Sequence, residues 1–389
     1  MGAPVFARAG AVLSIDLGAI IANWRLLQAR AAPAECAAVV KADAYGLGAA
    51  EVAPALAAAG CRVFFVATLD EGLALRRCLE QWREAATYAA VTNTAVPPSP
   101  PTIFVLNGAP RGGEADLAQH GLIPVLNGLG DVEAWALLSA MMDVRLPAAL
   151  QIDTGMSRLG LPPAELDRLS AEPGRLDGVA PVLVMSHLAC ADEPAHALNA
   201  RQRSAFDVAR TRLPAAPASL ANSSGIFLGA DYIFDLVRPG AALYGVSPNS
   251  AATNPMEGVV RLDGRILQVR EIDRDTTVGY GATYGARRAE RIATVAIGYA
   301  DGFLRSSSNR GCGYLDSFRV PLVGRVSMDL TTFDVTDAPA DLVYPGAAIE
   351  LIGPQRPVDA VALDAGTIGY EILTSLGPRY ARVYRPVAD

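Results

Sequence analysis

The sequence predicts a (β/α)8 barrel of the TIM type, followed by a smaller and mainly antiparallel β domain. Its 389 residues are enough for one large barrel and an appended domain. Up to about residue 246, short apolar runs alternate with helical patterns, as βα units do. Beyond it, period-two alternation punctuated by Gly, Pro and Asp takes over. We therefore expect a barrel over 1–246 and a β domain over 247–389, with the first 12 or so residues packed on that second domain.

Eight apolar runs are the candidate barrel strands. Each is apolar along its length, as expected for a parallel strand covered on both faces. A doubly wound open sheet is the alternative, but no GxGxxG follows the first run. The runs are 36–42, 62–68, 102–108, 123–127, 148–154, 182–188, 218–223 and 236–240.

The segments around these runs have helical spacing. Before the first run, Ile20, Trp24 and Leu27 follow i, i+4, i+7 spacing, and Asp16 is placed to cap that helix. Further helices are predicted over 71–85 and 199–213. The proline-rich stretch 96–101 is expected to be an exposed loop.

The second domain is predicted from alternation. The segments 291–297, 320–335 and 348–353 alternate with period two, which is typical of strands with one covered face. A single long helix is expected near the C-terminus, over 364–376.

Composition excludes several classes of function. The net charge is −7 and no basic stripe is interleaved with aromatics, so nucleic acid is not an expected partner. No signal peptide is evident, and no uncharged apolar stretch has membrane-spanning length. The five cysteines form no CxxC pair and no metal-like spacing with the three histidines. We expect reduced thiols, no metal site and a cytoplasmic location.

Lys41 is the first candidate for chemistry. It follows the apolar run 36–40 and opens into a turn that contains Tyr45 and Gly46. A lysine in an apolar setting has a lowered pKa and becomes a nucleophile, which suits a Schiff base with an aldehyde cofactor. The alternative is a lysine that only marks where the strand leaves the core.

Other polar residues follow the ends of later runs. Chemistry in such barrels gathers at the carboxyl ends of the strands, so these residues are expected to share one site. Taken one at a time, these residues have ordinary structural interpretations, such as a histidine in the core, a turn or a helix cap. The set comprises Lys41, Tyr45, Asp153 to Arg158, His187, Asn222, Ser223, Arg238, Pro239 and Gly240.

A phosphate site is predicted among them. Ser223 and the amides of Gly240 and Ala241 are donors of the type that binds phosphate, and Tyr45 adds a hydroxyl. No GxxxxGK[ST] loop is present, which disfavours a nucleotide.

Taken together, these residues resemble the alanine racemases, which use pyridoxal 5'-phosphate (PLP). The resemblance covers nearly the whole chain. VVKADAYGLG alone is typical of fold-type III PLP enzymes, and the C-terminal motifs separate racemases from relatives built on the barrel alone. The motifs are VVKADAYGLG (39–48), VATLDEG (66–72), IDTGMSRLG (152–160), SHLACADEP (186–194), NSSG (222–225), VRPGAALYG (237–245), YGATY (280–284), IGYADG (297–302), VGRVSMD (323–329) and TIGYEIL (367–373).

The resemblance implies roles in catalysis and in cofactor binding. Lys41 would hold PLP as a Schiff base and be one of two catalytic bases, and Tyr280 from the partner subunit of a homodimer would be the other. Arg238 would face the pyridine nitrogen, and His187 would link Tyr280 to Arg238. The remaining cofactor residues would be Tyr45, Asn222, Ser223, Gly240, Ala241 and Tyr370.

The resemblance also implies how the substrate is bound. Arg158 and the backbone of the partner's Met328 would clamp the substrate carboxylate. The substrate entryway would consist of Asp192, Arg305, Arg325 and Ile368.

Gln151 departs from the family pattern. Many members have a lysine there, carbamylated by carbon dioxide, that positions the arginine matching Arg158. Glutamine forms no carbamate, so a chloride ion or a direct amide hydrogen bond is expected to replace it. Leu47, where histidine is commoner, is a smaller deviation.

The function expected from this resemblance is interconversion of L- and D-alanine, supplying D-alanine for peptidoglycan. A broader racemase that accepts serine is the alternative within the fold. A PLP carrier with only the barrel is disfavoured by the second domain. A decarboxylase of this fold type is disfavoured by Arg238, because those enzymes commonly place an acid at the pyridine nitrogen.

Overall fold

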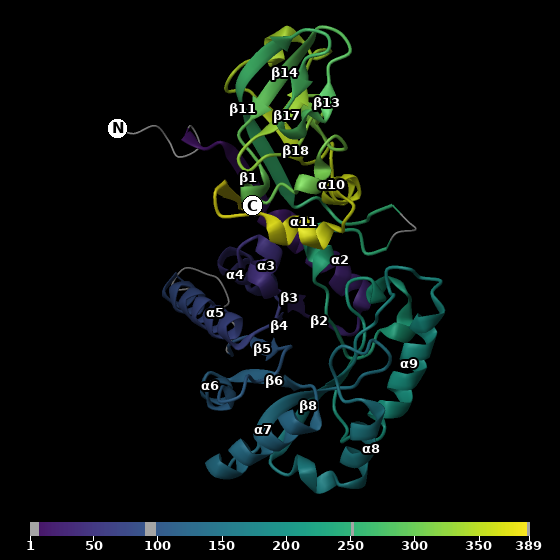
Figure 1. Cartoon of the computed structure of the whole chain (residues 1–389). Coiled ribbons are helices and arrows are strands. Elements are labelled where there is room, and N and C mark those ends of the chain that lie inside the picture. The colour runs from purple at the N-terminus through teal and green to yellow at the C-terminus, as the bar shows by residue number, and fades with distance from the viewer. Residues whose placement is uncertain (1–7, 90–98, 250–252, 387–389) are drawn as a thin grey trace.

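The chain folds into a barrel lobe and a β-rich lobe, which meet at the helix labelled α11 (Figure 1). The structure is a computed structural model that describes residues 8–89, 99–249 and 253–386. One cluster of buried apolar side chains runs from the barrel into the β-rich lobe.

The barrel strands are parallel, and all eight predicted strands are present. The first predicted strand consists of two short pieces, and every strand ends earlier than the pattern indicated. β3 to β9 form one sheet in sequence order, and β10 pairs with β2. The bounds are β2 Glu35–Cys36, β3 Ala38–Val39, β4 Val63–Val66, β5 Thr102–Val105, β6 Leu122–Leu126, β7 Leu146–Gln151, β8 Val179–Met185, β9 Ala218–Ser219 and β10 Leu236–Val237.

Backbone hydrogen bonds close the sheet into a ring. The amide of Ala37 donates to the carbonyl of Val237 at 3.0 Å, and the amide of Arg238 donates to Ala221 at 2.9 Å. The last strand thus joins both the first and the seventh. The predicted barrel is confirmed.

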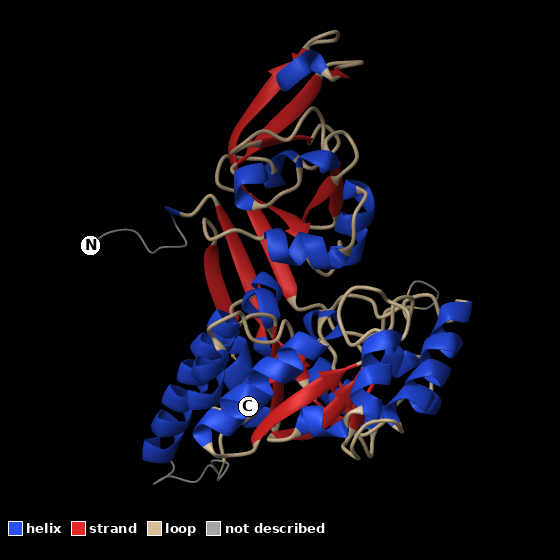
Figure 2. Ribbon diagram, turned by 60° about the horizontal axis from the view of Figure 1, so that its bottom comes forward, coloured by secondary structure: helices blue, strands red, loops and turns tan. Residues whose placement is uncertain are grey.

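Helices surround the ring (Figure 2). α2 begins after Asp16, whose carboxylate accepts the amide of Ala19 at 2.9 Å, and it buries Ile20, Trp24 and Leu27 as predicted. The helix bounds are α2 Leu17–Ala31, α3 Lys41–Gly46, α4 Ala49–Ala59, α5 Leu69–Ala89, α6 Glu114–Gln119, α7 Leu129–Met142, α8 Pro163–Ala171 and α9 Ala197–Arg210. Short 3-10 turns η2 Pro173–Leu176, η3 Gly225–Phe227, η4 Ala230–Tyr232 and η5 Ala241–Tyr244 complete this lobe.

The β-rich lobe is a mixed, mainly antiparallel sheet in the order β16-β15-β18-β11-β1-β19, with β14 and β17 branching from β11. β1 lies antiparallel to β11 and parallel to β19. The bounds are β1 Ala11–Asp16, β11 Val260–Ile272, β12 Thr277–Val278, β13 Tyr284–Gly285, β14 Glu290–Val295, β15 Cys312–Leu315, β16 Phe318–Pro321, β17 Thr331–Asp334, β18 Ala348–Ile352 and β19 Ala381–Arg385. Its short 3-10 turns are η6 Tyr280–Ala282, η7 Tyr299–Asp301, η8 Arg305–Ser307 and η9 Ala340–Leu342.

Two predictions for this lobe are wrong. The expected helix 364–376 is two helices, α10 Val358–Ala365 and α11 Gly369–Ser375, because Gly366 ends the first in a left-handed conformation (φ 69°). The expected run 320–335 is the two strands β16 and β17 with a loop between them. Of the predicted loop 96–101, residues 96–98 lie outside the described ranges, and Ser99 and Pro100 are exposed.

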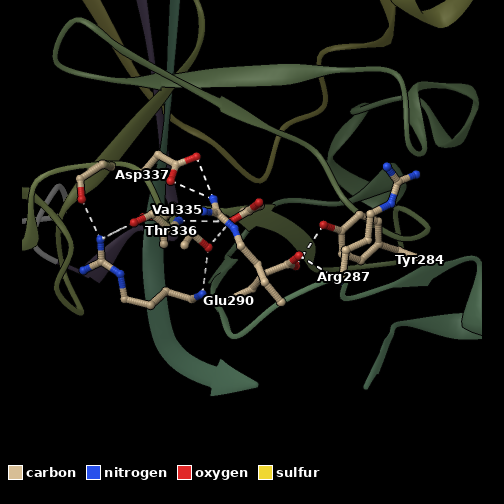
Figure 3. A network of polar contacts seen from close by, with 10 residues as sticks. Tyr284, Arg287, Glu290, Val335, Thr336 and Asp337 are labelled. Carbon is tan, nitrogen blue, oxygen red and sulfur yellow. Dashed lines mark hydrogen bonds and ion pairs between the residues drawn. The ribbon is translucent and has the colours of Figure 1, made fainter. Parts of the chain in front are cut away.

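A polar network joins strand β13 to strand β14 (Figure 3). Tyr280 lies on η6, between β12 and β13. At the end of this hairpin the Tyr284 hydroxyl donates to Glu290 at 2.9 Å, and the Arg287 amide donates to the same carboxylate at 3.2 Å. Since Glu290 is buried at the start of β14, the hairpin is tied to the main sheet.

Candidate active site

A cavity of about 690 Å³ opens at the carboxyl ends of the barrel strands, and residues of α11 line one side of it. Most of the residues predicted from the strand ends line it, so the sequence prediction of one shared site agrees with the geometry. The residues named in the sequence analysis that line it, whether from strand ends, the phosphate argument or the family resemblance, are Lys41, Tyr45, Gln151, Arg158, His187, Asn222, Ser223, Arg238, Gly240, Ala241, Ile368 and Tyr370.

Lys41 begins a left-handed turn. Strand β3 ends at Val39, so Lys41 lies after the strand rather than on it. Ala42, Asp43, Ala44 and Tyr45 all have φ between 52° and 57°. For residues other than glycine this conformation costs roughly 1–2 kcal/mol each. The turn therefore needs contacts that hold it in place.

The surroundings of Lys41 favour its neutral amine. Burial lowers the pKa of Lys41, and the nearby charge of Arg158 lowers it further, whereas the carboxylate of Glu71 opposes them. A neutral amine is the nucleophilic form of lysine.

Hydrogen-bond donors converge around Ser223. Its hydroxyl accepts the amides of Gly240 at 2.9 Å and of Ala242 at 3.2 Å. A Cβ on residue 240 would lie 2.3 Å from the hydroxyl oxygen of Tyr45, so only glycine allows this approach. Burial raises the pKa of Tyr45, which keeps its hydroxyl protonated and able to donate to an anion.

Arg238 is a buried cation on the cavity wall. It donates to the carbonyl of Ser186 at 2.6 Å and to the hydroxyl of Ser219. Burial lowers the pKa of Arg238 to about 9, so it remains charged at neutral pH. No carboxylate forms an ion pair with it in the described part of the chain.

His187 is held neutral beside this cation. Burial, together with the charges of Arg238, Arg158 and Lys41, lowers the pKa of His187 to about 3. At neutral pH its ring therefore acts as a hydrogen-bonding group without charge.

Gln151 and Arg158 both line the cavity, but the predicted direct hydrogen bond between them is not found among the described residues. Gln151 is buried at the end of β7. Arg158 is exposed.

Of the strand-end set, Asp153 to Ser157 and Pro239 do not line the cavity. Five residues implied by the family resemblance do not line the cavity of one chain either. Tyr280 is 73% exposed and Met328 is 53% exposed, both on the β-rich lobe. Arg325 lies beside the Tyr280 turn, because a Cβ on Gly281 would be 3.0 Å from its guanidinium. Asp192 lies near Tyr370. Burial raises the pKa of Tyr370, and the charge of Asp192 raises it further. The fifth, Arg305, begins η8.

Several lining residues were not singled out from the sequence. Leu106 and Asn107 directly follow β5. Their position at a strand end could have identified them from the sequence. No periodicity marks the others. They are Val39, Ala42, Leu159, Met185, Glu371 and Thr374.

Two further observations concern metals and membranes. Among the described residues, no group of three or more His, Cys, Asp and Glu side chains is arranged to hold a metal ion. Within the same ranges, no helix combines the length and the apolar character needed to cross a membrane.

The chain matches two family models over most of its length. Residues 15–248 match the alanine racemase N-terminal domain, and residues 259–384 match the alanine racemase C-terminal domain. An alanine racemase from Rhodospirillum rubrum is 53% identical over 383 residues, covering 98% of each chain. A catabolic alanine racemase from Mesorhizobium japonicum is 48% identical, covering 97% of this chain and 94% of the relative.

Solved structures agree with these sequence matches. The alanine racemase from Bartonella henselae, described with covalently bound pyridoxal phosphate, superposes with a TM-score of 0.88 at 44% identity. That alignment covers 97% of this chain and 100% of the other. The biosynthetic enzyme from Pseudomonas aeruginosa gives a TM-score of 0.84 at 34% identity, with the same coverage. Because the two family models together match most of the chain and a relative 53% identical spans nearly all of it, the chain belongs to the alanine racemase family.

Proposed function

We propose that this protein is a PLP-dependent alanine racemase that interconverts L- and D-alanine. The observation that carries the proposal is the cavity itself. It brings together the amine of Lys41, whose pKa is lowered, the hydroxyl of Ser223 and the guanidinium of Arg238, which has no carboxylate partner in the described part of the chain.

The donor set fits PLP. A phosphate group suits the hydroxyls of Ser223, Tyr45 and Tyr370 and the amide of Ala241, with Asn222 and Gly240 beside them. Arg238 suits a pyridine nitrogen, because a guanidinium donates a hydrogen bond but does not give up its proton. The amine of Lys41 suits the aldehyde carbon. When bound, PLP would supply the electron sink that makes the substrate Cα hydrogen acidic.

Two bases on opposite faces are the simplest way to invert a carbon centre. We assign Lys41 to one face. The second base would be Tyr280 of a second subunit, because Tyr280 is exposed and outside the cavity in its own chain. A homodimer with shared sites follows from this assignment, and His187 would connect Tyr280 to Arg238.

The substrate carboxylate would be held by Arg158 and by the backbone of Met328 of the second subunit. With no direct Gln151–Arg158 hydrogen bond in the described part of the chain, we propose that a chloride ion lies between the two side chains. Asp192, Arg305, Arg325 and Ile368 would form the entryway, and among these Ile368 lines the cavity from its own chain.

We place this activity in the cytoplasm, as a source of D-alanine for peptidoglycan. The five cysteines are all free thiols, which supports a reducing compartment.

The test is purification followed by spectroscopy and assay. The protein should show a visible absorbance band that borohydride removes, and it should racemise L-alanine. Lys41→Ala should abolish both the band and racemisation, and a panel including L-serine should show the alanine preference. A Lys41→Ala protein with full activity would overturn the assignment, and equal rates on serine would favour the broader racemase.

A further inference from the structure

We propose that Glu71 is a positioning residue for Lys41, which holds the Lys41 turn and sets the charge next to its amine. This inference rests on the proposed role of Lys41 in cofactor binding. Glu71 lies on α5, the helix that follows the second barrel strand.

The carboxylate of Glu71 joins two neighbouring strand ends. Its Oε1 accepts the amide of Ala42 at 2.7 Å, and its Oε2 accepts the amide of Ala67 at 2.7 Å. Ala42 is the residue directly after Lys41 and the first of the left-handed turn. A carboxylate with two acceptor oxygens therefore connects the start of this strained turn to the end of strand β4.

Helix capping explains only part of this arrangement. The Glu71 amide donates to the Thr68 hydroxyl at 3.3 Å, and the Thr68 amide donates back to Oε2 at 3.3 Å, which is the reciprocal pattern of a capping box. Both of these bonds are longer than the bonds to Ala42 and Ala67. Capping of α5 does not require the bond to Ala42, which comes from a different strand.

Glu71 is also the negative charge that opposes the surrounding cations at Lys41. Burial and Arg158 lower the pKa of Lys41, and Glu71 raises it. The other titratable side chains that share the cavity are Tyr45, Arg158, His187, Arg238, Tyr370 and Glu371. Without Glu71, the amine would face the cation of Arg158 with a weaker counter-charge.

Glu71→Gln tests both parts of the proposal. The glutamine amide keeps the size of the side chain but loses the charge and turns one acceptor into a donor. In the holoenzyme we expect the pH midpoint of the visible absorbance of the lysine-bound cofactor to fall by about 1 unit, as when an adjacent opposite charge is removed. In the full-length protein without cofactor, reductive methylation of Lys41 at fixed pH should become faster, measured by peptide mass spectrometry.

Thr68→Ala is the matched control, because it weakens the same helix cap and leaves the Glu71 carboxylate in place. It should lower the melting temperature without moving the absorbance midpoint. An unchanged midpoint in Glu71→Gln, or an equal shift in Thr68→Ala, would overturn the proposal.

Glu71→Asp provides a second variant in case Glu71→Gln does not fold. It keeps the charge, so we expect a midpoint close to that of the wild type, while its shorter side chain reaches only one of the two strand ends. A shift as large as that expected for glutamine would count against a role for the charge. If the wild type shows no borohydride-sensitive band, the proposed role of Lys41 is wrong. If the band is present but its pH midpoint is the same in Glu71→Gln as in the wild type, only the proposed role of Glu71 is wrong.

Discussion

At the scale of single residues, Gln151 is the departure from the family pattern that bears on Arg158. Glutamine carries no charge, so an anion between the two side chains would supply the negative charge that a carbamate supplies elsewhere. We predict that chloride raises activity at fixed ionic strength by about three- to tenfold, which corresponds to ~0.7–1.4 kcal/mol. The measurement is initial racemisation rate with chloride exchanged for gluconate.

Carbon dioxide provides the opposing test. Its removal should leave the rate unchanged in the wild type. Gln151→Lys restores an amine that forms a carbamate, so this variant should become sensitive to bicarbonate and insensitive to chloride. Loss of wild-type activity on bicarbonate depletion, or a carbamate found on another residue beside Arg158, would contradict the chloride model.

Residues at strand ends were predictable from sequence because parallel strands in a barrel deliver their carboxyl ends to one face. Lys41, Ser223 and Arg238 all reached the cavity in this way. The contact of Glu71 with Ala42 was not predictable, since it depends on a left-handed turn of four residues other than glycine. No sequence pattern signals such a turn, because local preference opposes it.

At the scale of elements, β1 connects the two ends of the chain. It lies between β11 and β19, with Leu13 and Ile15 fully buried. We predict that Leu13→Ala destabilises the protein by about 2–5 kcal/mol, as expected for a large-to-small change in a core. Hydrogen exchange should accelerate in β11 and β19 more than in the barrel strands β4 to β7.

Leu267→Ala is the control for this prediction. Leu267 lies on β11 but is 52% exposed, so its loss should change neither stability nor exchange appreciably. If Leu13→Ala accelerated hydrogen exchange evenly over both lobes, the stabilising effect of β1 would not be specific to the β-rich sheet.

Element boundaries explain where the sequence prediction failed. The helix predicted over 364–376 has helical spacing on both sides of Gly366, but the left-handed conformation of that glycine starts a turn. Strand β1 has only six residues, and its partners lie more than 200 positions away in the chain. Pairing at that separation is set by the tertiary fold, which local periodicity does not encode.

At the scale of the whole molecule, the residues proposed for the site do not come together within one chain. Lys41 lines the cavity of the barrel lobe, whereas Tyr280 and Met328 are exposed on the β-rich lobe and do not line it. The hydrogen bond from Tyr284 to Glu290 ties β13 to β14 (Figure 3). Tyr280, on the turn just before β13, is 73% exposed. Such a projecting residue suits a two-fold dimer, in which each subunit completes the other's site.

Hybrid dimers test this arrangement directly. Subunits with Lys41→Ala and subunits with Tyr280→Phe should each be inactive as homodimers. In a heterodimer, one of the two sites combines the native Lys41 with the native Tyr280, so we expect about half of the wild-type activity per heterodimer. If Tyr280 served its own subunit instead, both sites of the heterodimer would lack a base. Differently tagged subunits purified as heterodimers would distinguish these outcomes, with Lys41→Ala paired against the double variant as the inactive control.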